Sequence, residues 1–245
     1  MHIVIFGANG STGRLLTRRV LDSGHSAVAV TRRPDEFPGT DPGLRVVGAD
    51  VRRGGLAGIV AGADAVLSTL GVPFTRGPVD TYSVGTRNIV NAMREAAANR
   101  LVVVSSTGAH PARGRRHTPA ALRLFEPIIA RTIGKTVYDD IRRMEAVVRE
   151  SGLAWTIVRP SGLFDLPRVT NYVAGEVEPV GAFTARIDLA DYLVKIVQDG
   201  AAHRKTVVVS TTEHTPTVWE MIRREAFQGD AEPRSANNRT AAGNI

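Results

Sequence analysis

Three glycines near the start of the chain have the spacing needed to hold a phosphate group. An apolar run over residues 3–6 leads into the stretch GANGSTG at 7–13, and a helical pattern follows. The first glycine permits a tight turn, the second lets backbone approach a pyrophosphate, and the third allows close helix packing. Free N–H groups of the first helical turn then face the anion. We predict a dinucleotide-binding loop, with a merely structural turn as the alternative; its expected ligand contacts are Gly7, Asn9, Gly10, Ser11, Thr12 and Gly13.

Two arginines follow the next strand pattern. Arg32 and Arg33 come after the alternating run at 26–31. At this point of a dinucleotide fold, a carboxylate suits two free ribose hydroxyls, whereas an arginine suits a 2′-phosphate. Two arginines without a carboxylate predict NADP(H), and solvated turn residues are the alternative. A later strand pattern at 64–70 ends at Leu70 and Gly71, where a glycine again suits close approach of the dinucleotide.

Three hydroxyl side chains follow the continuous apolar strand pattern at 100–106. Ser105, Ser106 and Thr107 would emerge at the carboxyl edge of the sheet, where ligands bind in open α/β folds. We expect Ser105 to border the cofactor, and Ser106 and Thr107 to be catalytic. The alternative is that these hydroxyls only satisfy backbone groups at the strand exit.

The elements that must position these residues alternate between strand and helix patterns. With 245 residues, 43% of them apolar and 22% charged, the chain suits one soluble α/β domain. We predict a Rossmann-like, doubly wound parallel sheet over 1–228, with a small C-terminal substrate-pocket extension. Pocket segments are expected at about 108–134 and 161–187, and a flexible tail at 229–245. The expected strands are 3–6, 26–31, 44–49, 64–70, 100–106, 154–160 and 206–210, and later helices are expected at 82–99, 119–133, 135–151, from 188, and 216–227.

Composition excludes several other classes. The net charge of +7 arises from 31 basic and 24 acidic residues dispersed along the chain, with no nucleic-acid module. The densest basic cluster, at 113–117, is either a solvated loop or an attraction for an anionic substrate or cofactor. Without cysteines there are no disulfides or thiolate sites, and we expect no metal. No leader or membrane-spanning run is evident, so we expect a cytoplasmic monomer or homodimer that binds a small-molecule acceptor, without nucleic-acid or membrane partners.

Four stretches carry a family resemblance. They are the G-x-x-G-x-x-G loop, the DDIRRM run at 139–144, the segment from Arg149 through SGL to Arg159-Pro160, and the DLA helix start at 188–190. Over residues 1 to about 212 the chain resembles the atypical short-chain dehydrogenase/reductases, in particular the NmrA-like and biliverdin-IXβ reductase/flavin reductase-like NAD(P)H-binding proteins. The resemblance implies that cofactor and substrate share one domain.

The resemblance also implies roles for individual residues. Asp50 and Val51 would flank the adenine ring, although Asp50 could instead cap the next helix. Ser106 or Thr107 would lie near the nicotinamide, with Pro160 and its successors as a wall. His110 is an alternative acid, because it follows closely on the same strand end.

The chain departs from its resembling families at two positions. Ordinary members use Tyr-x-x-x-Lys, in which the lysine lowers the pKa of the tyrosine. Tyr138 is followed by Arg142, but if Glu145 keeps its usual register those two positions fall at Val137 and Ile141. One residue turns a helix by roughly 100°, so Tyr138, a third catalytic candidate, would point elsewhere. A histidine of the biliverdin-reducing group is replaced by Gly162, which argues against biliverdin but not against flavins or quinones.

Together these features favour an NADPH-dependent reductase that stacks a planar or carbonyl-bearing acceptor over the nicotinamide, such as a flavin, quinone or aromatic ketone. The alternative is a non-catalytic NADP(H)-binding sensor resembling NmrA-like regulators, which the missing tyrosine and lysine register supports. A third hypothesis is a nucleotide-sugar epimerase, which is disfavoured because the related epimerases keep the tyrosine and lysine of the Tyr-x-x-x-Lys pair.

Overall fold

The structure is a computed structural model that describes residues 1–73, 75, 77–110 and 134–216. Residues Met1–Thr215 form one compact unit. Five predicted features lie wholly or largely outside the described residues: the basic cluster, the pocket segment at about 108–134, the helix at 119–133, the terminal helix beyond Pro216, and the tail.

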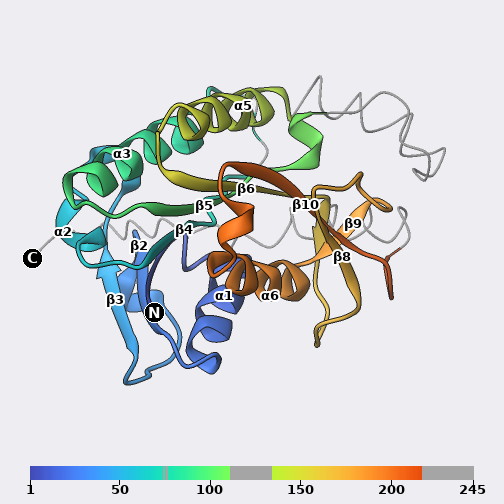
Figure 1. Ribbon diagram of the computed structural model, residues 1–245, viewed down its shortest axis with the longest axis horizontal. Coiled ribbons are helices and arrows are strands. Elements are labelled where there is room, and N and C mark those ends of the chain that lie inside the picture. The colour runs from blue at the N-terminus through green and yellow to red at the C-terminus, as the bar shows by residue number, and fades with distance from the viewer. Residues whose placement is uncertain (74, 76, 111–133, 217–245) are drawn as a thin grey trace, which may run out of the picture. The chain divides into compact units, whose positions relative to one another are not determined.

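A mostly parallel, eight-stranded sheet forms the centre of this unit, in the order β3-β2-β1-β4-β5-β6-β10-β8 (Figure 1). Only β8 runs antiparallel, paired with β10 at one edge. The chain fills one side of β1 first and then crosses to β4 on the other, so the strand order reverses between β1 and β4. The predicted Rossmann-like fold is confirmed. The strands are β1 (His2–Phe6), β2 (Ser26–Thr31), β3 (Leu44–Gly48), β4 (Ala65–Ser68), β5 (Arg100–Val104), β6 (Ala154–Pro160), β8 (Tyr172–Gly175) and β10 (Lys205–Thr211).

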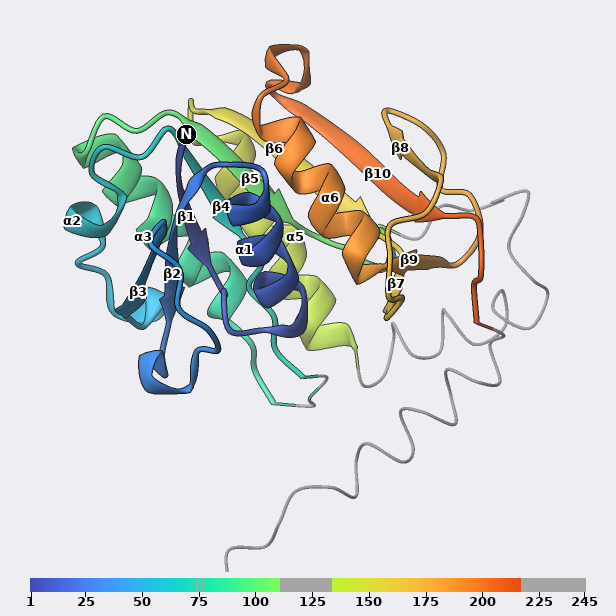
Figure 2. The same cartoon turned by 90° about the horizontal axis from the view of Figure 1, so that it is seen from below.

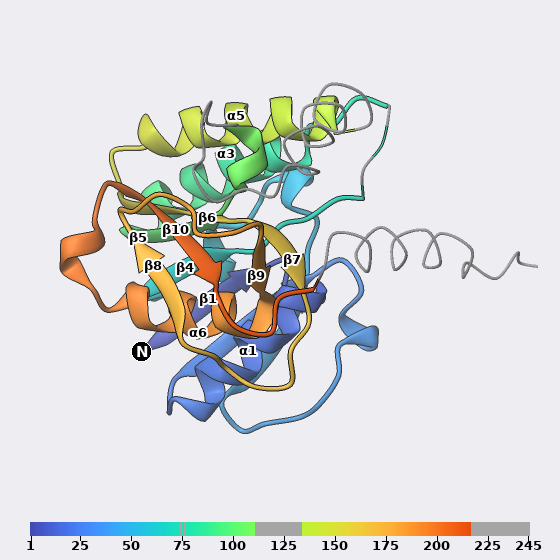
Figure 3. The ribbon, with the colours of Figure 1, turned by 90° about the vertical axis from the view of Figure 1, so that its right-hand side faces the viewer.

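Helices cover both faces of the sheet (Figure 3). One face carries α1 (Ser11–Asp22) and α6 (Arg186–Val197), which lie side by side in Figure 2. The other carries α3 (Thr81–Glu95) and α5 (Lys135–Arg149). Three features were not predicted from the sequence: the short helix α2, the edge strand β8, and the two-stranded parallel sheet of β7 and β9. The remaining elements are α2 (Ala57–Val60), β7 (Gly162–Phe164), β9 (Phe183–Ala185) and the 3₁₀ turns η1 (Pro34–Glu36), η2 (Val51–Arg53), η3 (Thr107–Ala109) and η4 (Gly200–Ala202).

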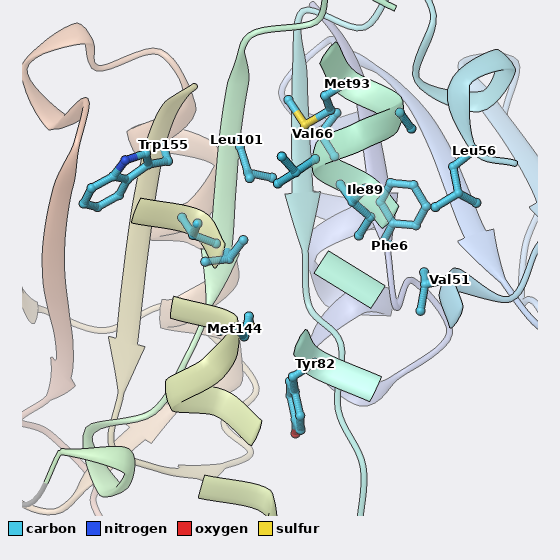
Figure 4. Close-up of a cluster of buried hydrophobic side chains, with 14 of the residues drawn as sticks. Phe6, Val51, Leu56, Val66, Tyr82, Ile89, Met93, Leu101, Met144 and Trp155 are labelled. Carbon is cyan, nitrogen blue, oxygen red and sulfur yellow. The ribbon is translucent and has the colours of Figure 1, made fainter. Parts of the chain in front are cut away.

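The alternation of apolar side chains along the strands produces these layers. Ile3 and Ile5 pack in the core under α1 and α6, whereas Val4 and Phe6 pack under α3 and α5. Figure 4 shows Phe6 and Val66 of the sheet gathered with Ile89 of α3. Two apolar faces on one sheet therefore require helices on both sides. No helix among the described residues is long and apolar enough to cross a bilayer.

Candidate functional site

The glycine loop lies where the strand order reverses. A Cβ on Gly7, whose φ is +76°, would come within 2.6 Å of the Thr69 carbonyl oxygen at the end of β4. A Cβ on Gly13 would come within 2.3 Å of the Gly7 carbonyl oxygen, because α1 starts directly against the loop. Backbone atoms cannot yield as flexible side chains do. Gly7 and Gly13 are therefore required by the fold itself.

Gly10 is different, because the protein does not itself require a glycine there. Its φ of −72° and ψ of 162° suit any residue, and a Cβ would meet only the Gly7 carbonyl oxygen, at 3.4 Å. Gly10 is exposed, and no side chain caps α1, so the first-turn N–H groups remain available to an anion. Asn9 is braced by Arg14, whose Nε donates to its carbonyl and amide oxygens at 3.1 and 2.9 Å. The Gly7–Gly13 loop and the first turn of α1 form a cradle that a pyrophosphate fits. A side chain at Gly10 would occupy part of the space that the pyrophosphate needs.

The two arginines after β2 are not equivalent. Arg33 pairs with Glu36 of its own turn, with Nη1 3.0 Å from the carboxylate oxygen. Arg32 is exposed and forms no ion pair within the described residues. The pKa of Asp50 is lowered by the Arg52 backbone N–H, with the charges of Arg52 and Arg32 as further causes. Of Arg32 and Arg33, Arg32 is therefore the arginine whose guanidinium has no carboxylate partner within the described residues and can bind a ligand.

Asp50 has a structural role. Its carboxylate accepts from the Arg52 N–H at 3.0 Å and so caps η2, which is the alternative that the sequence left open. A contact of Asp50 with adenine stays a prediction.

Val51 and Leu70 meet over Gly85 of α3. A Cβ on Gly85 would lie 2.8 Å from Val51 Cγ2 and 3.2 Å from Leu70 Cδ1. The Asn88 side chain also donates to the Val51 carbonyl at 2.7 Å. These contacts make one apolar wall from two strand ends, as an adenine-binding role would require. The sequence reading missed Gly85 and Asn88, although a glycine inside a predicted helix signals close packing.

The start of the loop after β4 is anchored to α3. Gly71 is exposed, and its Cβ would meet nothing within 4 Å. The next residue, Val72, donates its N–H to the Tyr82 hydroxyl at 3.2 Å. The backbone at Gly71 is therefore accessible and anchored, which suits the predicted approach of a dinucleotide.

The three hydroxyls after β5 have separate environments. Ser105 is buried and donates to Glu145 at 2.6 Å, so its side chain serves the interior. Ser106 is half-buried, and its oxygen accepts from the Gly108 N–H at 3.1 Å. Thr107 is buried and donates to Ser161 across 3.5 Å. The exit of β5 therefore presents Ser106 most openly, with Thr107 in contact with the end of β6.

The fully buried Glu145 side chain is the centre of a network that the sequence did not predict. Arg159 of β6 donates to both carboxylate oxygens, at 2.8 and 2.6 Å, and Arg149 donates at 2.8 Å. Burial alone would raise the pKa of Glu145, but the hydrogen bonds from Arg159 and Ser105 and the Arg159 charge lower it to about 2. The network ties the ends of β5 and β6 to α5. The spacing of Glu145 and Arg149, one turn apart, was the available signal.

His110 adjoins the same network. Its Nε2 lies 2.9 Å from a Glu145 oxygen. Burial lowers the pKa of His110, and the attraction of Glu145 offsets this only in part. The lowered pKa favours the neutral form of the imidazole, and this nitrogen faces the buried carboxylate. A role as catalytic acid stays a prediction.

Tyr138 lies closer to the strand end than its helical position suggested. A Cβ on Gly108 would fall 2.6 Å from the Tyr138 hydroxyl oxygen, so the phenol packs directly on η3. Val137 and Ile141 are buried in the core at 3% and 4% exposure, in line with the register inferred from Glu145. Tyr138 thus lies against Gly108, and the two positions that this register assigns to the tyrosine and lysine hold apolar residues.

The end of β6 forms another side of this region. Pro160 is buried at the last position of the strand. A Cβ on Gly162 would lie 3.2 Å from both the Ala182 carbonyl oxygen and Phe183 Cδ1, because β7 pairs there with β9. A histidine at Gly162 would need this small sheet to shift. Among the described residues, no group of three or more His, Cys, Asp and Glu side chains could hold a metal ion.

The fold and its glycine cradle define a dinucleotide-binding protein of the Rossmann type. Residues 7–200 match a protein family described as NAD(P)H-binding, and the chain belongs to that family. Many solved structures share the fold, including the following two. One is the oxidoreductase ylbE from Lactococcus lactis, with 18% identity, a TM-score of 0.71 and 96% and 100% of the two chains covered. The other is a wide-type short-chain dehydrogenase/reductase from Veillonella parvula in complex with NADP, with 21% identity, a TM-score of 0.70 and 86% and 95% covered.

Curated relatives extend the comparison. An uncharacterized protein of Mycobacterium tuberculosis is 30% identical over 214 residues, which are 84% of this chain but 20% of the relative. This chain thus spans about a fifth of the length of that relative. The uncharacterized sugar epimerase YhfK of Bacillus subtilis is 26% identical, with 79% of this chain and 86% of that protein covered. The 2-alkyl-3-oxoalkanoate reductase of Stenotrophomonas maltophilia is 31% identical, with 46% and 37% covered.

Proposed function

We propose that this protein is an NADPH-dependent reductase of a small planar or carbonyl-bearing acceptor, of the flavin, quinone or aromatic ketone type. The observation that carries the proposal is the placement of two features on one sheet edge. The open cradle at Gly10 follows β1, and the Ser106 and Thr107 hydroxyls follow β5, with only β4 between these strands. The Stenotrophomonas relative, by its name, reduces a carbonyl-bearing compound.

Each group of residues would have one task. The Gly7–Gly13 loop and the first-turn N–H groups of α1 would hold the pyrophosphate, and Arg32 the 2′-phosphate. When bound, NADPH supplies a hydride and is left as NADP⁺, while the acceptor gains the hydride and one proton from solvent. Ser106 and Thr107 would orient the acceptor by hydrogen bonds, and Pro160 would exclude water from one side. No strong acid is needed for acceptors of this kind.

The test is the loss of dihydronicotinamide absorbance when the protein meets NADPH with flavins, quinones, biliverdin and aromatic ketones in turn. We expect oxidation that depends on an acceptor, and about a 10-fold or greater loss of turnover in Ser106→Ala or Thr107→Val, with the NADPH Kd nearly unchanged. Ser26→Ala, at the opposite edge of the sheet, is the control. Unchanged turnover in both site variants would reject this assignment of the active site.

The preference for NADPH has its own test. Arg32→Ala should weaken NADPH binding by roughly 10- to 100-fold and leave NADH binding unchanged, because it removes charge-assisted hydrogen bonds to the 2′-phosphate. Arg33→Ala should weaken it less, since Glu36 already neutralises that guanidinium. Calorimetric titration of both variants with both cofactors checks this. Equal preference for NADPH in the wild type and in the double variant would contradict the assignment.

One observation favours a second candidate, a non-catalytic NADP(H)-binding sensor. Val137 and Ile141, the positions that the Glu145 register assigns to the proton-transfer pair of the resembling enzymes, are apolar and buried in the core, which supports a protein without that pair. The same observation weighs against an epimerase, despite the name of the Bacillus relative. Tight NADPH binding without oxidation by any acceptor, together with co-purification of a protein partner, would favour the sensor.

A further inference from the structure

We infer that Ser161 is a positioning residue that acts through the Thr107 hydroxyl and thereby sets how the acceptor is held. The inference rests on the proposed reductase function and adds a residue from a second strand end. Ser161 Oγ lies 3.5 Å from Thr107 Oγ1, and the two residues follow the neighbouring strands β6 and β5. Both are buried, at 6% and 5% exposure.

The backbone of Ser161 is held rigidly. Its N–H donates to Thr184 Oγ1 at 2.9 Å, and that hydroxyl in turn donates to the Val209 carbonyl at 2.6 Å. The single proton of the Thr184 hydroxyl is thus committed to β10, and its oxygen fixes Ser161 from β9. Within the described residues, the Ser161 hydroxyl has Thr107 as its hydrogen-bond partner. The side chain of Ser161 is therefore directed to the β5 exit and not to the small sheet.

Thr107 stands on an equally fixed support. It is the first residue of η3, whose N-terminus is capped by Ser106. Arg142 of α5 donates to the Ala109 carbonyl at the other end of this turn, at 2.7 Å. Tyr138 packs on Gly108 between them. Two hydroxyls on rigid backbones can hold a ligand group more accurately than hydroxyls on a mobile loop.

The chemistry follows from the hydroxyl pair. A hydroxyl carries one proton and two lone pairs, and the proton rotates to suit its partners. In the structure Thr107 donates to Ser161 Oγ; when the Thr107 proton turns to an acceptor oxygen, the Ser161 hydroxyl can rotate and donate to Thr107 Oγ1 instead. The hydrogen bond from Ser161 orients the Thr107 proton and strengthens its donation, since hydrogen bonds in a chain polarise one another. Ser161 would thus raise turnover by acting through the Thr107 hydroxyl.

The experiment compares Ser161→Ala with Ser161→Thr, which restores a hydroxyl, and with the control Ser26→Ala. Using the best ketone or quinone substrate, we expect Ser161→Ala to lower kcat about 10-fold, with the NADPH Kd within about twofold of wild type. Ser161→Thr should recover most of kcat. In the Thr107→Val background, Ser161→Ala should cause little further loss, because the two residues act as a unit. The rescue and the non-additivity separate positioning from a general structural defect.

The outcomes that overturn the inference are distinct. Two results would overturn the role of Ser161 alone. In the first, the wild type turns over an acceptor and Ser161→Ala has the same kcat. In the second, the losses of kcat from Thr107→Val and Ser161→Ala multiply in the double variant. NADPH binding without turnover of any acceptor by the wild type would overturn the reductase function, and the inference with it. Should Ser161→Ala fail to fold by circular dichroism, Ser161→Cys keeps the volume and replaces the hydroxyl by a weak donor, so the same loss of kcat is expected.

Discussion

At the scale of single residues, the glycines of one loop serve two different purposes. Gly13 has no room for a Cβ because the Gly7 carbonyl would lie 2.3 Å away, whereas the one atom near a Cβ on Gly10 lies at 3.4 Å. The first distance involves backbone, which cannot move without displacing α1 from the sheet. The second is an ordinary van der Waals contact. Glycine at position 13 is therefore explained by the fold, whereas the fold does not require glycine at position 10, which we propose leaves room for a ligand.

This contrast gives a matched pair of variants. Gly10→Ala should change the free energy of unfolding by less than about 1 kcal/mol but weaken NADPH binding at least 10-fold, because the methyl group enters the pyrophosphate cradle. Gly13→Ala should lower the free energy of unfolding by about 3 kcal/mol or more, since the clash is with backbone. Denaturant unfolding and cofactor titration measure the two effects. A Gly10→Ala protein with wild-type NADPH affinity would show that the cradle does not hold the pyrophosphate.

At the scale of elements, one helix supplies the cap of another. Asp80 makes no side-chain cap at the start of α3. Asp140 of α5 does so instead: its carboxylate accepts the Tyr82 N–H at 2.8 Å and the Ser83 N–H at 3.4 Å, and also binds the Ser83 hydroxyl. Its charge lies at the positive end of the α3 dipole. The packing of α3 against α5 therefore includes the capping hydrogen bonds of Asp140 as well as apolar contacts.

Removal of the Asp140 cap should lower the stability of the protein. Asp140→Ala leaves buried N–H groups unpaired and should lower the free energy of unfolding by about 3 kcal/mol. The neighbouring Asp139→Ala is the control, because its partners Lys135 and Arg142 are exposed and such pairs contribute at most about 1 kcal/mol. Urea unfolding followed by circular dichroism gives both values. Equal losses in the two variants would contradict a capping role for Asp140.

The elements also show what the sequence could and could not predict. The central parallel strands and the four long helices were predictable because each strand carries a local apolar run and each helix an apolar period. The strands β7, β8 and β9 were not, since each has only three or four residues and pairs with a distant segment. Their region holds scattered glycines and prolines, which resembles a loop in any local reading.

The same limit applies to the site. The cradle was predictable because its glycines are neighbours in the sequence and their spacing has a physical meaning. The contact of Thr107 with Ser161 joins residues 54 positions apart, and the Glu145 network joins α5 with two strand ends. Hydroxyl and charged residues are common, so their types alone do not reveal such partners. Only the parallel packing of β5 and β6 brings them together.

At the scale of the whole molecule, the Glu145 network makes stability depend on pH. The pKa of Glu145 is lowered to about 2 in the folded protein, from 4.5 as its ordinary value. The unfolded state therefore binds more protons between these values, and stability falls as pH falls through this window. A carboxyl whose pKa is lowered this far contributes roughly 3 kcal/mol at neutral pH. His110, whose pKa is also lowered, acts in the same direction at higher pH.

Glu145→Gln tests this coupling. At pH 7 it should lower the free energy of unfolding by about 3 kcal/mol or more, because Arg159 and Arg149 lose their carboxylate. Below pH 4.5 the difference from wild type should shrink, as the wild-type carboxyl becomes protonated on unfolding. Glu150→Gln, an exposed neighbour on the same helix end, should show neither effect. Denaturant unfolding at several pH values from 7 to about 2.5 supplies the measurement. If the difference in free energy of unfolding between Glu145→Gln and wild type stayed constant across this range, Arg159 and Arg149 would not hold the carboxylate ionised. Another interaction would then have to connect the ends of β5 and β6 to α5.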